Sequence, residues 1–309
     1  MNIPKNKYRG RLAQIPIYLG KCFRQFLFQN DWKFLPMSGL IAILVSVVTG
    51  ANMFVTMEGT SQGAFAMTCV CMWNGFFNSI QSICRERPII KREHRSGMHI
   101  FSYMSAHIIY QAVICVLETV IMMAVYVIGG MHFPTEPLIT PWVYLDFGIT
   151  LFLVTFAADI ISLFISSLVQ STTTAMTLMP FLLIFQLVFS GFLFELSGPL
   201  KKLANLSIAH YGLISIASLA DYNSQPSVLL WNTLFKLRSI EEVDLLVHYV
   251  EDEGLLNTIL AKSGELMQEP AYAHTAENVI GCWGALIVFA IIFAVLADFA
   301  LSFVDKDHR

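Results

Sequence analysis

The chain has 309 residues, of which 13% are charged and 56% are hydrophobic, and its net charge is -3. Soluble domains carry about 25% charged residues, and a soluble chain of this length cannot keep so much apolar surface away from water. The composition therefore excludes a cytosolic enzyme, a disordered chain and a nucleic-acid binder, which would need a basic surface. What remains is an all-α polytopic membrane protein.

The first 33 residues are expected to form a cytoplasmic and interfacial segment. Within residues 16–33, one helical face carries Leu19, Phe23, Phe26 and Leu27, while the opposite one carries Lys21, Arg24 and Gln25. This pattern predicts an amphipathic helix at the inner membrane interface. A helix packed on another subunit is the alternative. No short apolar region with a small-residue cleavage site is visible, so we expect no cleaved signal.

Six apolar runs of about 20 residues follow, which is the length that a helix needs to cross a bilayer core. They cover residues 34–56, 63–84, 106–128, 142–169, 174–194 and 278–303. Pro180 lies inside the fifth run, and a membrane helix tolerates it where neighbours satisfy the freed carbonyl. We therefore expect residues 34–309 to form one transmembrane domain with six spans.

Lysine and arginine are concentrated in segments that would lie on one side of the membrane. Fourteen of the 19 basic residues precede the first run, follow the last run, or lie in the loop after the second run. They include Lys5, Lys7, Arg9, Lys306 and Arg309 at the two ends. The short loops on the other side carry none. The positive-inside rule then places both termini in the cytoplasm.

Residues 195–277 form a long external insertion with eleven acids and five bases. Its apolar stretch 206–220 is too short to cross a bilayer, so we expect a re-entrant segment or an external cap. Ser239 and Glu242 have the spacing of a capping box, and the residues after them predict an acidic amphipathic helix. We interpret its acids as a solvated face. A site for a cation or a cationic substrate is the alternative.

The loop after the second run mixes both signs of charge, from Arg85 to Arg95. An anchor that only orients the chain needs bases alone, whereas alternating charges suit a helix that docks on another protein through ion pairs. The pattern is carried by Glu86, Arg87, Pro88, Arg92, Glu93 and Gly97.

This pattern resembles the membrane domain of type-2 ABC exporters, especially the G-subfamily-like branch, in its bacterial form without a fused ATPase domain. That family carries a Glu-Arg-Pro, Arg-Glu and Gly pattern after its second span. Two further matches are the segment Phe189-Ser190-Gly191-Phe192-Leu193 near the end of the fifth run and the segment Ile208-Ala209-His210-Tyr211-Gly212, which is followed by Ala220-Asp221-Tyr222-Asn223. With the order of spans and loops, the resemblance covers nearly the whole chain.

The resemblance implies a permease subunit of the bacterial inner membrane that moves a hydrophobic or amphipathic substrate outward, such as a lipid, a peptide or a drug. It also implies a second membrane domain, as a homodimer or a heterodimer, surrounded by lipid. The chain contains no Gly-x-x-x-x-Gly-Lys-Ser/Thr phosphate loop. We therefore expect separate ABC ATPase subunits to bind ATP and Mg²⁺. We expect this chain to have no catalytic residue, cofactor, metal or nucleic acid of its own.

The resemblance also implies roles for individual residues. Coupling to the ATPase would involve short cytoplasmic helices with Glu86, Arg87, Arg92, Glu93 and Gly97. A substrate pathway between the second and fifth spans would be lined by Asn74, Phe77, Leu183, Ile184 and Leu187, and Phe192 and Leu193 would plug its outer end. For the apolar residues among them, ordinary helix packing is the alternative interpretation.

The residues alone suggest three other functions. Glu118 and Asp159 lie inside spans, where a charge costs about 2.5–3.5 kcal/mol; they would form a structural polar network or serve an ion-coupled carrier, although no internal repeat of the carrier type is visible. An intramembrane protease would need paired acids, but Asp146 and Asp159 are thirteen residues apart, which is roughly 220° around a helix. Finally, the chain could transmit ATPase motion to an external partner through its acidic helix.

Overall fold

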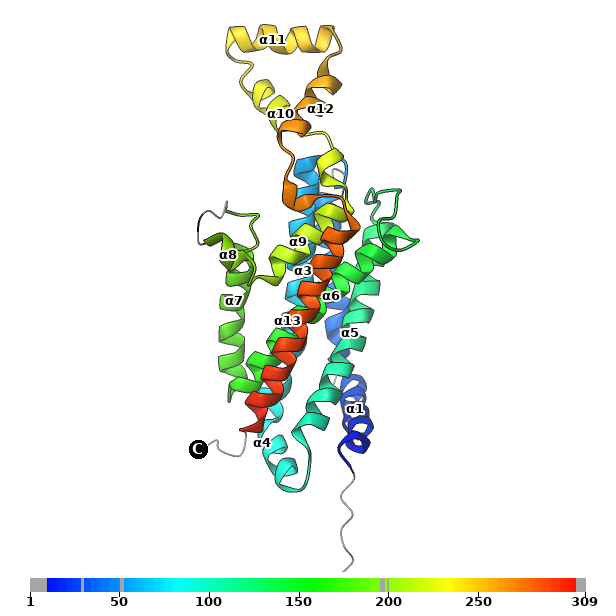
Figure 1. The fold of residues 1–309 in the computed structure, drawn as a ribbon, viewed down its shortest axis with the longest axis vertical. Coiled ribbons are helices and arrows are strands. Elements are labelled where there is room, and N and C mark those ends of the chain that lie inside the picture. The colour runs from blue at the N-terminus through cyan, green and yellow to red at the C-terminus, as the bar shows by residue number, and fades with distance from the viewer. Residues whose placement is uncertain (1–9, 29–30, 51–52, 195–197, 199, 304–309) are drawn as a thin grey trace, which may run out of the picture.

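The structure is a computed structural model that describes residues 10–28, 31–50, 53–194, 198 and 200–303. Within these ranges the chain is helical and has no strand (Figure 1). The predictions on the charged ends of the chain, made for Lys5, Lys7, Arg9, Lys306 and Arg309, fall outside the described residues.

Three of the described helices are long and apolar enough to cross a bilayer. They are α5 (Ile100–Ile128), α6 (Val143–Leu168) and α13 (Ala276–Ser302). They correspond to the third, fourth and sixth predicted runs. Helix α5 begins six residues before the predicted third run, at Ile100, directly after its N-cap residue His99.

The other three predicted runs correspond to α2 (Phe34–Thr49), α3 (Met57–Ser79) and α7 (Thr172–Val188). Their predicted boundaries were wrong. Residues 57–62, expected as a loop, begin α3 because the Thr56 hydroxyl accepts a hydrogen bond from the Gly59 N–H at 3.2 Å and caps the helix. The fifth run was placed too long, because Gly191 has a φ of 85° and the chain leaves the helix before it. The count of six spans stays a prediction.

The centre of the bundle is α6, which packs most extensively against α3 and α13 (Figure 1). The backbones of α3 and α6 come into contact at Gly75. A Cβ there would collide with the Thr155 carbonyl and would lie 2.7 Å from the Ala158 Cβ. Two side-chain bonds cross the same interface: the Ser79 hydroxyl donates to the Asp159 carbonyl at 2.6 Å, and Ser162 donates to a carbonyl of α3 at 2.8 Å. Small residues that allow close approach are typical of packed membrane helices.

The apolar stretch expected as a re-entrant segment forms α9 (Ile208–Leu219), a helix of 12 residues that is almost wholly buried. It packs against α3, α6 and α13. Gln186 of α7 caps its amino-terminal end: the Gln186 side-chain oxygen accepts from Ile208 N at 2.8 Å, from Ala209 N at 3.4 Å and from the Ser207 hydroxyl at 2.9 Å. A buried glutamine therefore joins the end of the fifth run to the segment that follows it.

The insertion at residues 195–277, which is predicted to be external, is mainly helical in its described residues, as predicted. It contains α8 (Leu200–Ala204), α10 (Leu229–Lys236), α11 (Glu241–Asp252) and α12 (Leu256–Leu266), with single 3-10 turns at Tyr222–Ser224 and Pro270–Tyr272. The predicted capping box is wrong, because Ile240 is the N-cap residue of α11 and makes no side-chain capping bond. Glu58 at the start of α3 holds the insertion to the bundle, since its carboxylate accepts from the Ser227 hydroxyl at 2.6 Å and from Val228 N at 3.1 Å.

Candidate functional site

The charged loop after α3 forms a helix, α4 (Ser82–Arg95). Two residues separate it from the end of α3 at Ser79. Gly97 ends it with a φ of 103°. The N–H groups of Gly97 and Met98 bond to the carbonyls of His94 and Glu93, both at 3.1 Å, which is the pattern of a glycine-terminated helix end. The conformation at Gly97 explains why the motif needs a glycine there.

The two faces of α4 differ sharply. Its inner face buries Ile83, Cys84, Glu86 and Ile90. Its outer face exposes alternating basic and apolar side chains, namely Arg85, Pro88, Ile89, Arg92 and Arg95. The helix therefore presents a mixed surface outward and keeps one charge of the motif, that of Glu86, inside the protein.

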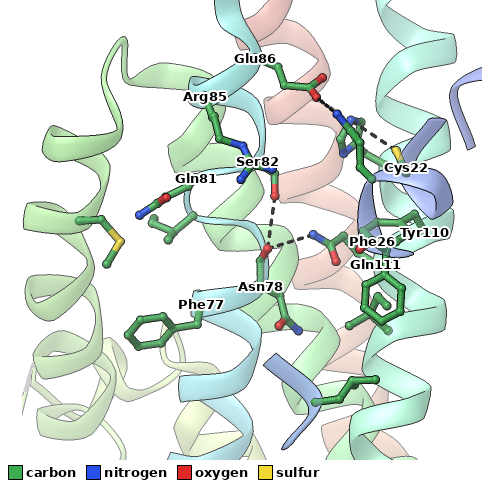
Figure 2. A pocket seen from close by; sticks show the side chains of 16 residues that line it. Cys22, Phe26, Phe77, Asn78, Gln81, Ser82, Arg85, Glu86, Tyr110 and Gln111 are labelled. Carbon is green, nitrogen blue, oxygen red and sulfur yellow. Dashed lines mark hydrogen bonds between the residues drawn. The ribbon is translucent and has the colours of Figure 1, made fainter. Parts of the chain in front are cut away.

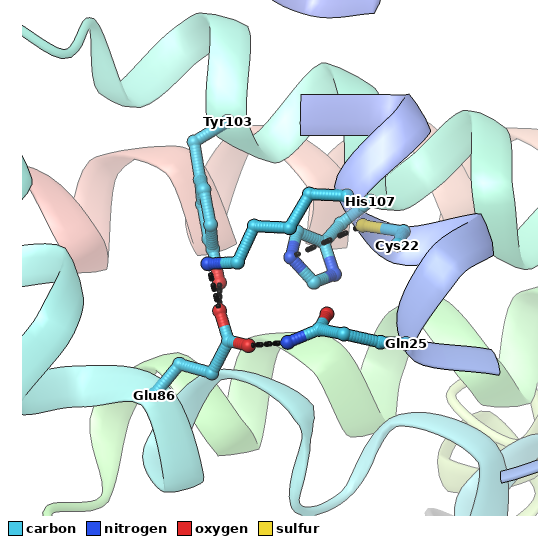
Figure 3. A network of polar contacts seen from close by, with 6 residues as sticks. Cys22, Gln25, Glu86, Tyr103 and His107 are labelled. Carbon is cyan, nitrogen blue, oxygen red and sulfur yellow. Dashed lines mark hydrogen bonds and ion pairs between the residues drawn. The ribbon is translucent and has the colours of Figure 1, made fainter. Parts of the chain in front are cut away.

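Buried Glu86 is held by side chains from α1 (Arg11–Phe28) and α5 (Figure 3). Lys21 Nζ lies 2.9 Å from Glu86 Oε2, and Gln25 Nε2 donates to Oε1. The Tyr103 hydroxyl donates to Oε2 at 3.1 Å. Beside this group, Cys22 Sγ lies 3.7 Å from His107 Nε2. Three helices are thus fastened together through one carboxylate.

The electrostatics of this group favour an ionised Glu86. Burial by itself raises the pKa of Glu86, but the hydrogen bonds from Gln25 and Lys21 and the Lys21 charge together outweigh burial, so the pKa is lowered. A carboxyl with a lowered folded pKa stabilises the protein above the ordinary glutamate pKa, and this stabilisation is lost as the pH falls through the folded pKa. At the neighbouring thiol, burial and then the charge of Glu86 raise the pKa of Cys22 to about 12, so it stays protonated.

The first half of α4 is also fastened to α6. Arg87 Nη1 donates to the carbonyls of Ser167 and Val169 at 2.7 and 3.0 Å, where α6 ends. A guanidinium is favourable at the end of a helix because it satisfies carbonyls that have no partner within the helix. In return, the Ser166 hydroxyl accepts from the N–H groups of Ile83 and Cys84, both at 3.1 Å.

The far end of α4 is clamped by α1. The Gln14 side chain donates to the Gly97 carbonyl at 3.2 Å and accepts from His99 N at 3.0 Å. The Ser102 hydroxyl donates to the Arg11 carbonyl at 2.6 Å. Bonds to α1, α5 and α6 therefore hold α4 at its start, through Ile83, Cys84, Glu86 and Arg87, and the bonds of Gln14 hold the chain just beyond its end.

A pocket of about 290 Å³ opens beside Glu86 (Figure 2). Side chains from α1, α3, α4 and α5 form most of its walls, and Met176 of α7 completes them. Its polar lining includes Asn78, Gln81, Ser82, Arg85 and Gln111, and its apolar lining includes Phe26, Leu35, Phe77 and Tyr110. The pocket is amphipathic and lies where the bundle meets the α4 helix.

A comparison with known families matches this chain. The family model described as ABC-2 type transporter covers residues 15–219, which is about two thirds of the chain. The chain belongs to the ABC-2 type transporter family. No curated protein matches it at a significant level. An ABC-2 type chain is a transport subunit with a multi-pass membrane location. The predictions of a transport subunit and of a multi-pass membrane protein are therefore confirmed. The matched residues extend from α1 to the end of α9 and stop before α10.

The helix expected at the inner interface of this ABC-2 type protein is present as α1, but its faces differ from the prediction. Lys21 and Gln25, which were placed on the solvated side, point inward to Glu86. Leu27, placed on the apolar face, is 63% exposed. The reason is that the buried Glu86 carboxylate is costly unless it is paired and hydrogen-bonded, and α1 supplies its donors.

The coupling residues of the motif are spread over different environments. Glu86 and Arg87 contact neighbouring helices of the same chain, whereas Arg92 is exposed on the outer face. Glu93 is half-buried and lies near Tyr18, whose pKa is raised first by burial and then by the Glu93 charge. Sequence reasoning assigned all of these ion pairs to another protein. It missed Lys21, because a base in an amphipathic helix gives no sign of its partner.

The predicted pathway residues lie in different surroundings, and their common role stays a prediction. Asn74 is buried and donates to the Ser38 hydroxyl of α2 at 2.8 Å. Phe77 and Met176 line the pocket beside Glu86. On α7, Ile184 is 57% exposed, while Leu183 and Leu187 are half-buried against the core.

The two plug residues are placed differently from each other. The ring of Phe192 stacks on that of Phe65 of α3, with 4.4 Å between the ring centroids and 19° between their planes. Leu193 is about half exposed. Phe192 is thus fixed to the bundle by an aromatic contact, whereas the plug role of both residues stays a prediction.

The intramembrane acids do not form a pair. The Asn78 amide donates to Glu118 Oε2 at 2.8 Å. Asp159 is fully buried, and within the part of the chain that the structure describes neither of its carboxylate oxygens has a hydrogen-bond partner. Asp146, weighed as a protease residue, instead accepts from Thr140 N at 3.0 Å and Ile139 N at 3.1 Å and so holds the loop before α6.

Proposed function

We propose that this chain is the permease subunit of an ATP-driven ABC exporter in the bacterial inner membrane. It moves a hydrophobic or amphipathic substrate outward across a dimer of membrane domains, with both of its termini in the cytoplasm. Separate nucleotide-binding subunits, which hold ATP and Mg²⁺, supply the energy. The family match supports the permease role, and the arrangement around α4 supports the coupling.

The observation that carries this proposal is that one face of α4 is bonded to the bundle while the opposite face is exposed. The inner face is fastened to α1, α5 and α6 through Glu86, Arg87 and Ser166. The outer face leaves basic and apolar side chains exposed for another protein. Because these inner contacts join α4 to three other helices, a displacement imposed on its outer face would be passed to the bundle.

The outer face gives a direct test. Arg92→Glu places an acid in the middle of this face, and we expect it to weaken binding of the cognate ABC ATPase roughly tenfold, because an unfavourable charge at an interface opposes association. Binding is measured by titrating the purified ATPase against the full chain in nanodiscs.

The matched control is Lys236→Glu, a reversal of the same size at an exposed base of α10 in the external insertion. It should leave ATPase binding unchanged. Equal binding by wild type and Arg92→Glu, or an equal loss in both variants, contradicts the assignment of the outer face of α4. Absence of any nucleotide-binding subunit from the native complex overturns the proposed function as a whole.

A second candidate function, an ion-coupled carrier, is favoured by one observation. Asp159 is completely buried and its carboxylate oxygens have no partner among the described residues. An unpaired buried carboxylate is costly when ionised. Either Asp159 stays a neutral acid throughout, or it releases and rebinds a proton during a transport cycle.

Asp159→Asn separates these two possibilities. The amide has nearly the shape of the neutral acid but cannot release a proton. If the chain works as an ATP-driven permease, we expect Asp159→Asn to keep transport within about twofold of wild type, because a neutral side chain already occupies the site. Loss of transport in this variant, together with transport that a pH gradient drives without ATP, favours the carrier.

A further inference from the structure

Helix α11 stands at the end of the external insertion that lies farthest from α4 (Figure 1). It crosses the top of two supports, α10 and α12, and its main packing partner is α10. Two valines, Val247 and Val250, are buried on its inner side. The rest of its surface projects away from the bundle, and it lies beyond the residues that the family match covers.

The outer side of α11 carries an exposed apolar pair. Leu245 is 66% exposed and Tyr249 is 58% exposed. They are four residues apart, so they lie side by side on a helix, on the side roughly opposite Val247 and Val250. An exposed leucine and tyrosine, side by side on a helix face that contacts no other element, are typical of a surface that binds another molecule.

The surroundings of this pair are acidic. Residues 239–253 contain six acids and no lysine or arginine. By helical phase, Glu241, Glu242 and Asp252 border the apolar pair, and all three are exposed. His248 lies to one side, with its Nε2 3.7 Å from the Asp244 carboxylate. The face thus combines an apolar centre with a negative rim.

The charge of this rim selects the kind of partner. An anionic membrane surface is repelled by six acids, and a second copy of α11 set face to face would bring the same acids together. A cationic amphipathic helix has the complementary pattern, since its apolar stripe meets Leu245 and Tyr249 while its lysines and arginines meet the rim.

We propose that the outer face of α11 is a docking surface for a cationic amphipathic peptide. Leu245 and Tyr249 bury the apolar stripe of the peptide, and Glu241, Glu242 and Asp252 pair with its basic side chains. The proposal goes beyond the permease function and does not depend on it, because the surface lies at the opposite end of the molecule from the helix assigned to ATPase binding.

The test uses the full chain in nanodiscs of zwitterionic lipid, without ATP or ATPase. The probe is a fluorescent helical peptide with leucines on one face and lysines on the other, and its binding is followed by anisotropy. The double variant Leu245→Ser/Tyr249→Ser is expected to bind at least about tenfold more weakly. Glu241→Gln/Glu242→Gln/Asp252→Asn is expected to bind more weakly and to lose most of the salt dependence of binding.

Leu266→Ser is the matched control, because Leu266 is 86% exposed on the same insertion, at the end of α12. It should bind the peptide as wild type does, and a peptide with glutamates in place of lysines should bind none of the proteins. Equal affinity of wild type and the Leu245/Tyr249 variant overturns the proposal. An equal loss of peptide binding in Leu266→Ser also overturns it. So does a Leu245/Tyr249 variant that binds the peptide normally but loses self-association or attachment to anionic vesicles. Circular dichroism of each variant verifies that the helices remain folded.

Discussion

Glu86→Ala is expected to lower ATP-driven transport roughly tenfold, which corresponds to about 1.4 kcal/mol of coupling free energy. The variant removes the acceptor shared by Lys21, Gln25 and Tyr103. Helix α4 then keeps its link to α6 through Arg87 and the contact just beyond its end with Gln14 of α1, but its first half loses the link to α1 and α5. A push from the ATPase would move α4 without moving the whole bundle. The measurement is transport and ATP hydrolysis by the reconstituted complex.

The same variant should lower the free energy of unfolding by about 1–3 kcal/mol, because the Tyr103 hydroxyl and the Gln25 amide are left without their acceptor in a largely buried place. Glu86→Gln separates stability from charge. Its oxygen still accepts from Gln25, so much of the stability should remain, while the ion pair with Lys21 is gone. As the pH is lowered through the depressed pKa of Glu86, wild type should approach Glu86→Gln in stability.

Glu265→Ala is the control for Glu86→Ala, because Glu265 forms an exposed ion pair with Lys262 at 2.6 Å in the external insertion. Exposed pairs contribute about 0–1 kcal/mol, so Glu265→Ala should leave transport and stability near wild type. If Glu86→Ala transports normally while its ATPase stays bound, force does not pass through the contact between α4 and α1. If the swap Lys21→Glu/Glu86→Lys restores transport lost in the single variant, the ion pair itself carries the coupling.

Long apolar helices were predictable from the sequence because their signal is local. Helices α5, α6 and α13 are continuous runs whose length and composition fit a bilayer. The boundaries of α3 were not predictable from hydropathy, because its first turn is polar and is fixed by a cap from Thr56. The helix α9 was predictable as too short to cross, but its anchoring by Gln186 was not, since a glutamine in an apolar run gives no sign of which helix end it serves.

The candidate site shows the same limit at the level of side chains. The motif from Glu86 to Gly97 pointed to α4, and Gly97 has a positive φ as a glycine can adopt. The partners of Glu86 come from residues 65 and 61 positions away, Lys21 and Gln25, and no periodic pattern connects them. Charge partners distant in the chain are set by the packing of α1 on α5, which only the folded structure supplies.

Gly75→Ala is the second substitution for which a large effect is expected, because it acts at the contact between the two most extensively packed helices. The added Cβ meets the Thr155 carbonyl, the Ala158 Cβ at 2.7 Å and the Asp159 N at 2.8 Å. Two of these atoms belong to the α6 backbone, so no side-chain rotation can relieve the overlap, and α3 must move away. We expect a loss of about 1–3 kcal/mol in unfolding free energy, measured by denaturation in detergent.

Gly148→Ala is its matched control, because Gly148 lies within α6 and a Cβ there meets no atom within 4 Å. It should leave stability unchanged or raise it by up to about 1 kcal/mol, because alanine has the higher helix propensity. An equal loss of stability in both variants would contradict the close contact at Gly75. Separation of α3 from α6 also weakens the bonds of Ser79 and Ser162 across that interface. Since α4 follows α3 after only two residues, Gly75→Ala should reduce transport even where the ATPase still binds, because α3 no longer carries α6 with it.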